Sequence, residues 1–341
     1  MSASSVPDGV RYALAFMVPA IGTLALTPVA ARAAHRFGVL DTPGGHKVHR
    51  GATPYLGGVA VAAGLLLIGG VTAGTNGELL TILAGALVLG AVGLMDDMRT
   101  VSPSIRLVLE GAVGVSLWLV GVRAGVLETP LVDLPVTVLW VVAVVNAFNV
   151  IDNMDGLAAG VATASALGIA SIAALEGDFL VASFAFAIAG ASLGFLRYNL
   201  PPARIFLGDA GSMLLGALIA ALTLKLDIQV RNDSARLAAV VLLAGAALFD
   251  LSLVVVARLL GRRKVWLGST DHASHRLAAR GHTNMRVAAT FAASQTACSG
   301  LAVWVYRQEP DEAVITIATV GAAWVVLIAV LLRLPHPLPA R

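Results

Sequence analysis

The sequence predicts an all-α membrane protein, a polytopic bundle of about eleven transmembrane helices. Hydrophobic residues make up 58% of the 341 positions and charged residues only 13%, and the mean hydropathy is +0.86. A water-soluble domain could not cover its surface with so few charges. The apolar residues also gather in runs of the roughly 17–25 residues that cross a hydrocarbon core about 30 Å thick.

The apolar runs set the expected helices. We expect spans near positions 12–31, 55–75, 78–95, 106–122, 132–149, 156–175, 179–197, 212–226, 236–257, 286–306 and 313–332. The first run is longer than the core of a signal peptide and has no basic leader, so we expect it to be retained as a span.

The basic residues predict the orientation. With about eleven spans, alternate connections lie on opposite faces, and about seventeen of the 23 Lys and Arg residues fall on one of them. Basic connections stay in the cytoplasm. We therefore expect the N-terminus outside, the C-terminus in the cytoplasm, and one domain over residues 1–341. The cytoplasmic site segments of that domain are expected at 32–54, 96–105, 149–156, 197–212 and 258–285.

The segment at the centre of this pattern is 146–156. Asn146, Asn149, Asp152 and Asp155 recur every third residue, which on a helix places them along one narrow stripe. Two carboxylates and two amides at a membrane boundary need a cation or hydrogen-bonding group to face. A divalent metal ion, a Lys side chain or a polar substrate would each supply it, whereas helix capping needs only one such residue.

Two other acidic positions point to the same chemistry. Asp96 and Asp97 follow an apolar run, and adjacent carboxylates there repel each other unless a cation or proton lies between them. Asp209 lies in a glycine-flanked turn before Ser212, where backbone N–H groups can hold phosphate while the carboxylate holds Mg²⁺. The alternative for Asp209 is an ordinary helix cap, and for the nearby Phe206 a core position instead of a stacking surface.

The remaining polar residues leave more alternatives open. Lys47, near Arg50, can neutralise phosphate or belong to an ordinary basic loop. His272 and His275 share a helix face, and phosphate or sugar contact suits them better than zinc because no Cys or Glu lies at ligand spacing. Asp250, deep in an apolar run, is a functional candidate that points into the bundle.

Several function classes are disfavoured. The basic residues form no continuous stripe, so we expect no nucleic-acid partner. The single cysteine, Cys298, cannot form an intrachain disulfide. The chain shows no internal repeat, which weighs against transporters built from duplicated halves.

Together the motifs resemble those of the polyprenyl-phosphate N-acetylhexosamine-1-phosphate transferases, and most closely the GlcNAc-1-phosphate branch. This membrane family also includes the phospho-N-acetylmuramoyl-pentapeptide transferases. The resemblance runs from Asp41 to Leu277 in family order. It rests on Asp41, Pro43, Lys47, His49, Pro54, Gly57, Gly58, Asp96, Asp97, Asn146, Asn149, Asp152, Asp155, Gly156, Leu157, Asn199, Pro202, Ala203, Phe206, Gly208, Asp209, Gly211 and Ser212.

Two departures from the family pattern leave the identity of the sugar open. The chain has His46 before Lys47 where the family usually has Arg, and Ser274 replaces one of three usual histidines.

The resemblance implies transfer of N-acetylhexosamine-1-phosphate, most simply GlcNAc-1-phosphate, from a UDP-sugar to undecaprenyl or decaprenyl phosphate, with release of UMP. The implied cofactor is Mg²⁺, with Mn²⁺ as a substitute, held by Asp209, Asp155 and Asp152. The implied catalytic residues are Asp96, Asp97, Asp152, Asp155, Asp209 and His272. The implied substrate-binding residues are Lys47, His49, Asn146, Asn149, Asn199, Phe206, His275 and Arg276, with Phe206 stacking on uracil.

The resemblance also implies a bacterial inner-membrane enzyme that begins a cell-envelope glycopolymer at the cytoplasmic face, and it is compatible with a homodimer. Two other functions remain as alternatives. An intramembrane prenyltransferase would use Asp-rich motifs to bind Mg²⁺-diphosphate, but it would leave Lys47 and the Asp209 turn without a purpose. A cation-coupled transporter would place its acids through the membrane depth, whereas these acids collect at one face.

Overall fold

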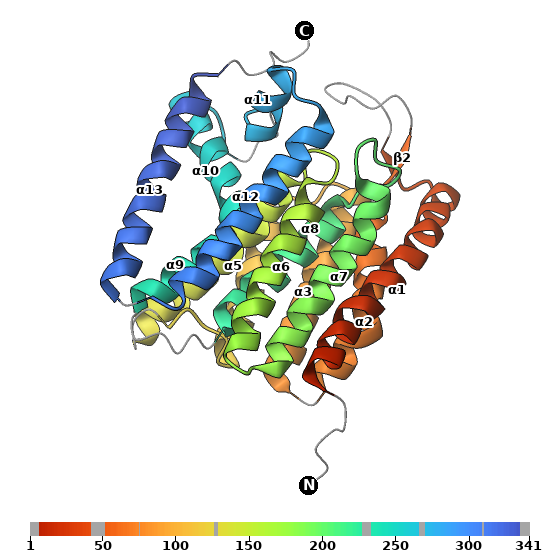
Figure 1. The fold of residues 1–341 in the computed structure, drawn as a ribbon. Helices are drawn as coiled ribbons and strands as arrows, with labels where there is room; N and C mark the ends of the chain where they lie inside the picture. The colour runs from red at the N-terminus through yellow and green to blue at the C-terminus, as the bar shows by residue number, and fades with distance from the viewer. Residues whose placement is uncertain are drawn as a thin grey trace.

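The computed structural model of the chain describes residues 7–41, 52–74, 76–125, 129–226, 233–265, 270–308 and 310–334. Within these ranges the protein is a helical bundle with one small antiparallel pair of strands (Figure 1). The elements are α1 (Asp8–Phe37), β1 (Leu40–Asp41), β2 (Thr53–Pro54), α2 (Gly57–Ala73), α3 (Gly77–Met98), α4 (Pro103–Leu119), α5 (Pro130–Ile151), α6 (Leu157–Leu175), α7 (Phe179–Asn199), α8 (Gly208–Lys225), α9 (Asp233–Leu243), α10 (Gly245–Leu260), α11 (Ala273–Ala279), α12 (Asn284–Val305) and α13 (Pro310–Leu332).

The helices confirm the all-α class and a protein with several candidate membrane spans. Among the described residues, seven helices are long and apolar enough to cross a membrane, and the bent pair α9 and α10 would make an eighth. Every predicted apolar run overlaps a helix, and the run over 236–257 overlaps two, α9 and α10. The described apolar part of α2 is short, Gly57–Leu67. The count of eleven crossings therefore stays a prediction.

The predicted single helix over 236–257 is wrong in one respect. The chain bends by 79° between α9 and α10, next to Ala244. Such a break frees backbone groups that lipid cannot satisfy. Gln295 of α12 satisfies them, because its Oε1 accepts from the Ala246 N–H at 2.9 Å and its Nε2 donates to the Leu242 and Leu243 carbonyls at 3.1 Å each.

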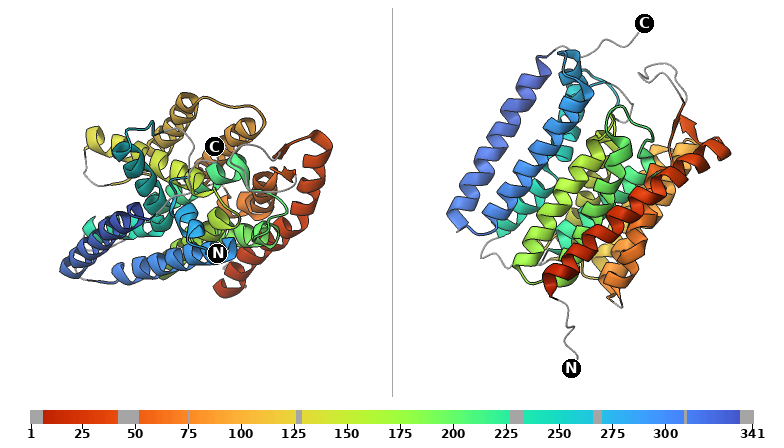
Figure 2. Two further views of the ribbon diagram at one scale, coloured as in Figure 1. Left: turned by 90° about the horizontal axis from the view of Figure 1, so that it is seen from above. Right: turned by 45° about the vertical axis from the view of Figure 1, so that its right-hand side comes forward.

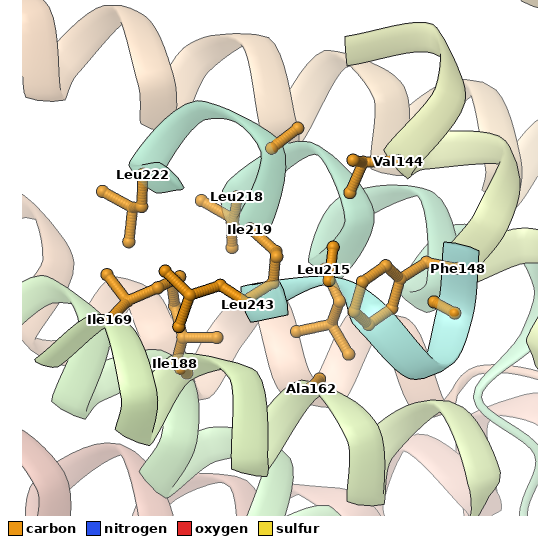
Figure 3. Close-up of a cluster of buried hydrophobic side chains, with 14 of the residues drawn as sticks. Val144, Phe148, Ala162, Ile169, Ile188, Leu215, Leu218, Ile219, Leu222 and Leu243 are labelled. Atoms are coloured by element: carbon orange, nitrogen blue, oxygen red, sulfur yellow. The ribbon is translucent and has the colours of Figure 1, made fainter. Parts of the chain in front are cut away.

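The centre of the bundle is α8, which is buried along almost its whole length. Apolar side chains of α5, α6, α7 and α9 surround it, as Figure 3 shows for Val144, Phe148, Ala162, Ile169, Ile188, Leu215, Leu218, Ile219, Leu222 and Leu243. Figure 2 shows α1 along one side of the bundle and α12 and α13 at the other. The first turn of α8 is thereby fixed in the interior.

Glycines let the neighbouring backbones approach that first turn. A Cβ on Gly58 of α2 would lie 2.2 Å from the Gly211 nitrogen, and a Cβ on Gly93 of α3 would lie 2.2 Å from the Asp209 carbonyl oxygen. Small residues allow this close packing of membrane helices. Gly58 of the sequence motif thus serves helix packing against α8, whereas Gly57 lets α2 approach the Phe206 carbonyl and the Phe195 ring of α7.

Candidate functional site

The predicted polar segments meet at the end of the bundle that carries β2 and α11 (Figure 1). Hydrogen bonds join each of them to another across long stretches of sequence. The joining bonds are Phe206 N to Pro54 O (2.9 Å), Asp209 N to Asp97 Oδ1 (2.9 Å), Ala203 N to Asp155 Oδ2 (2.9 Å) and Ser274 Oγ to Asn153 Oδ1. Chain segments around positions 54, 97, 153, 206 and 272 therefore form one site.

Arg106, in the first turn of α4, lies at the centre of the acids. Its Nη1 is 2.6 Å from Asp96 Oδ2 and 3.2 Å from Asp209 Oδ2, and its Nη2 donates to Asn149 Oδ1 at 2.7 Å. Asn149 in turn donates to Asp209 Oδ1 at 2.7 Å. One guanidinium thus holds two carboxylates and an amide together. From the sequence, Arg106 was used only as one of the basic residues that predict the orientation in the membrane, and it was not predicted as a site residue.

Asp97 is held by the start of α8. Its two carboxylate oxygens accept the backbone N–H groups of Asp209 (2.9 Å) and Ala210 (3.1 Å). A carboxylate is favourable there because the N-terminus of a helix carries unsatisfied donors and a partial positive charge. Gly208 enters the helix with φ +72°, and a Cβ on it would lie 2.6 Å from Asp97 Oδ2. The glycine therefore keeps Asp97 in contact with the helix.

The polar stripe is helical only in its first half. α5 ends at Ile151, so Asn146 and Asn149 lie on the helix, whereas Asp152 and Asp155 lie in the turn before α6. The predicted four-residue helical stripe is wrong for this reason. Asn146 does not face the acids around Arg106, because its Nδ2 donates to Glu110 of α4 and to the Val142 carbonyl.

The turn residues still belong to the acidic cluster. Burial raises the pKa of Asp152 well above its ordinary value, and the carboxylates of Asp209, Asp97 and Asp155 raise it further. A hydrogen bond from the backbone of Gly208 offsets part of this rise. Several acids therefore lie close enough to oppose one another's ionisation, which is the condition that a bound cation relieves.

Aromatic rings flank the same turn. Phe206, directly before α8, is half-buried and packs against Tyr55 with ring centroids 5.9 Å apart. Burial raises the pKa of Tyr55, and Asp41 adds to the rise. Tyr55 is therefore a neutral phenol beside the acidic cluster.

The two histidines come to the site with α11, His272 as its N-cap residue and His275 within the helix. His272 Nδ1 lies 2.9 Å from Asp250 Oδ2, and its ring meets that of His275 edge-on at 5.5 Å between centroids. Burial lowers the pKa of His275, and His272 lowers it further. The expectation that Asp250 points into the bundle is confirmed, because this carboxylate has no exposed surface.

Two predicted contact residues are turned to backbone groups instead. Asn199 accepts from the Gly156 N–H and donates to the Ile205 carbonyl, both at 3.0 Å, so it joins two turns of the site. Arg276 is buried and its Nη1 donates to the carbonyls of Leu331 and Leu334 at the end of α13. Both residues position elements of the site. Lys47 and His49 fall outside the described residues.

The donor set suits a hard divalent cation, although the acids are not arranged around one. Carboxylates and amide oxygens are the ligands that Mg²⁺ prefers. In the described part of the chain, no three His, Cys, Asp or Glu side chains are grouped closely enough to hold an ion as they stand. The reason is visible in the contacts, since Arg106 and backbone N–H groups now occupy the oxygens of Asp96, Asp97 and Asp209.

Comparison with known proteins gives a consistent result. The model of glycosyl transferase family 4 matches residues 79–227. The chain is 31% identical over 284 residues to a probable undecaprenyl-phosphate N-acetylglucosaminyl 1-phosphate transferase of Bacillus subtilis, covering 80% of this chain and 78% of the relative. It is also 31% identical over 316 residues to the decaprenyl-phosphate N-acetylglucosaminephosphotransferase of Mycobacterium leprae, covering 81% and 79% of the two chains. A phospho-N-acetylmuramoyl-pentapeptide-transferase of Heliobacterium modesticaldum is 34% identical over 210 residues, 54% of this chain and 64% of that protein.

Proposed function

Because the chain belongs to glycosyl transferase family 4, the family of the polyprenyl-phosphate N-acetylhexosamine-1-phosphate transferases, we propose that it transfers GlcNAc-1-phosphate from UDP-GlcNAc to a polyprenyl phosphate. An oxygen of the lipid phosphate attacks the β-phosphorus of the UDP-sugar. The bond from that phosphorus to the bridging oxygen breaks, UMP leaves, and a polyprenyl diphosphate sugar remains. This reaction is the first membrane step of a cell-envelope glycopolymer.

The observation that carries the proposal is the convergence of Asp96 of α3, Asn149 of α5 and Asp209 of α8 on the guanidinium of Arg106. Asp152 of the α5–α6 turn lies close enough to Asp209 and Asp97 for their charges to raise its pKa. Both substrates are anions, so the enzyme must offset their mutual repulsion while it aligns them. A transporter would spread its acids through the membrane depth, and a prenyltransferase would have no need of the aromatic pair Tyr55 and Phe206 beside α8.

The metal belongs to this proposal. Asp209, Asp152 and Asp155 would hold Mg²⁺, or Mn²⁺ in its place, next to the first turn of α8. The ion would polarise phosphoryl oxygens and offset charge that develops on them. With the ion on Asp209, Arg106 would be released from this carboxylate, which it binds now, and could face the diphosphate.

The two adjacent aspartates, Asp96 and Asp97, have different roles in this proposal. Asp97 fixes the start of α8, since both of its oxygens accept backbone N–H groups. Asp96 accepts from the Val101 N–H at 2.7 Å and from the guanidinium of Arg106 at 2.6 Å. We assign Asp96 to the lipid phosphate, from which it takes a proton once Arg106 moves.

Placement in the membrane follows from the basic residues. The proposal has about eleven crossings, an external N-terminus and a cytoplasmic C-terminus. The site then opens to the cytoplasm of a bacterium, where UDP-sugars are made, at the level of the inner leaflet that holds the lipid phosphate.

The test uses purified full-length protein in nanodiscs with undecaprenyl phosphate. It receives UDP-GlcNAc, UDP-GalNAc or UDP-MurNAc-pentapeptide in turn, with Mg²⁺ or with EDTA, and UMP and product lipid are measured. We expect product from UDP-GlcNAc with Mg²⁺ only, and none from Asp209→Asn although that variant remains folded. Product in EDTA, or full turnover by Asp209→Asn, would refute the assigned metal site. No UMP from any donor would refute the reaction.

A further inference from the structure

Asp250 is a buried carboxylate to which the proposed reaction gives no role. It lies in α10, shortly after the bend from α9, and has no exposed surface. Its Oδ2 lies 2.9 Å from His272 Nδ1, and its Oδ1 accepts the backbone N–H of Ala273 at 2.8 Å. Burying an unpaired charge inside a membrane protein costs free energy, so we attribute the presence of this carboxylate to these two contacts.

The contact fixes the proton on the imidazole of His272. Nδ1 lies 2.9 Å from Asp250 Oδ2 and 3.1 Å from Asn153 Nδ2. A carboxylate only accepts hydrogen bonds, and a bond to a charged group is stronger than one between neutral groups, so Nδ1 carries a hydrogen and shares it with Asp250. The other ring nitrogen, Nε2, is then left for a different partner, and it has no hydrogen bond within the described ranges of the chain. A histidine held in this way presents one defined nitrogen in one orientation.

The imidazole itself lies at the acidic site. Its Nδ1 is also 3.1 Å from Nδ2 of Asn153, which lies in the α5–α6 turn between Asp152 and Asp155. Asn153 is itself held, since its Nδ2 donates to the Val150 carbonyl at 2.8 Å and its Oδ1 accepts from Ser274. α11 is thus tied to the turn that we assign to the metal.

We propose that Asp250 is a positioning residue that holds His272 in the Nδ1-protonated form and directs Nε2 toward the diphosphate of the substrate. This inference rests on the proposed function for the identity of the substrate. The arrangement of Asp250 and His272 can be tested without turnover.

Asp250→Asn is the informative variant. The carboxamide oxygen can still accept from Ala273, which leaves the amide N–H facing His272 and favours the opposite tautomer. In protein labelled with 15N-histidine, the His272 signal is identified by its loss in His272→Gln. We expect solid-state NMR to show a protonated Nδ1 in the natural protein and an unprotonated Nδ1 in Asp250→Asn. An unprotonated Nδ1 in the natural protein overturns the inference, whether or not the sugar transfer is found.

The kinetic test separates positioning from general support of the fold. We expect Asp250→Asn to lower kcat by about 10- to 100-fold, as is typical when the orienting partner of a functional histidine is lost. In a His272→Gln background the same change should alter kcat by less than about 2-fold, because coupled residues are not additive. A further loss of tenfold or more in that background overturns the inference.

Asp133→Asn is the matched control. Asp133 is an equally buried acid at the start of α5, and it accepts two hydrogen bonds, from Trp118 Nε1 at 2.9 Å and from the Gly125 N–H at 2.6 Å. We expect this variant to keep kcat and to match Asp250→Asn in thermal stability. If Asp250→Asn alone fails to fold, the carboxylate serves the fold and the inference is wrong.

Discussion

Replacing Arg106 by alanine removes the positive charge that holds the acidic cluster together. The guanidinium makes three hydrogen bonds, to Asp96, Asp209 and Asn149. Only 16% of the Arg106 side chain and 11% of the Asp96 side chain are exposed, but 33% of Asp209 is. Breaking a buried ion pair from one side costs about 3–5 kcal/mol, and the solvent at Asp209 places the expected loss near the lower end, about 3 kcal/mol.

Thermal unfolding of detergent-solubilised protein in EDTA measures this loss. In large domains one kcal/mol shifts Tm by about 2–4 °C, so we expect a decrease of roughly 6 °C or more. Arg99→Ala is the control, because Arg99 lies in the connection between α3 and α4, just before the helix that carries Arg106, and is exposed. It should leave Tm unchanged. Arg106→Lys keeps the charge but not the fork of donors, so its Tm should lie between the two.

Added Mg²⁺ sharpens the test. An ion that binds only the folded state raises Tm. If Arg106 and the ion share the same carboxylates, Mg²⁺ should raise the Tm of Arg106→Ala more than that of the natural protein. Equal increases would refute the idea that the guanidinium occupies the place of the metal.

Three further changes probe the surrounding site. Gly208→Ala forces a left-handed φ on alanine and a clash with Asp97, so it should lower stability by at least about 2 kcal/mol, whereas Gly177→Ala, at φ +74° with open space around it, should lose only about 1 kcal/mol. Phe206→Ala should weaken binding of the UDP-sugar by isothermal titration more than binding of the lipid phosphate, and equal weakening would argue against stacking. Asp152→Asn should raise Tm at neutral pH in EDTA, because a raised pKa means that the charged carboxylate destabilises the folded state there; a lowered Tm would contradict this.

The helical class and the place of most helices could be predicted because apolar runs must cover lipid. The bend between α9 and α10 could not, since residues 237–249 around the break are all apolar or glycine. The side chain that satisfies the broken backbone, Gln295, lies in another helix. Arg106 was missed as a site residue for a related reason. A basic residue at the end of a membrane helix looks the same in sequence whether it serves orientation or a cluster of acids.

Within the site, the motifs predicted correctly which segments come together. They were a poorer guide to the atoms that each residue contacts. Asp97, Asn149, Asp209 and His272 lie at the common site. Arg276 instead binds α13, because a motif records that a polar group is required without recording whether its partner is substrate or backbone.

The hydrogen bonds from Arg276 to the end of α13 make the position of α11 depend on a helix that is synthesised later. The carbonyls that Arg276 binds belong to Leu331 and Leu334, more than fifty residues later in the sequence. During synthesis the histidine-bearing α11 therefore emerges long before its anchor exists. Before α13 is made, Nη1 of Arg276 lacks both carbonyl partners, although Nε can already donate to the Asp271 carbonyl. The final position of α11 therefore depends on a helix that is synthesised after it.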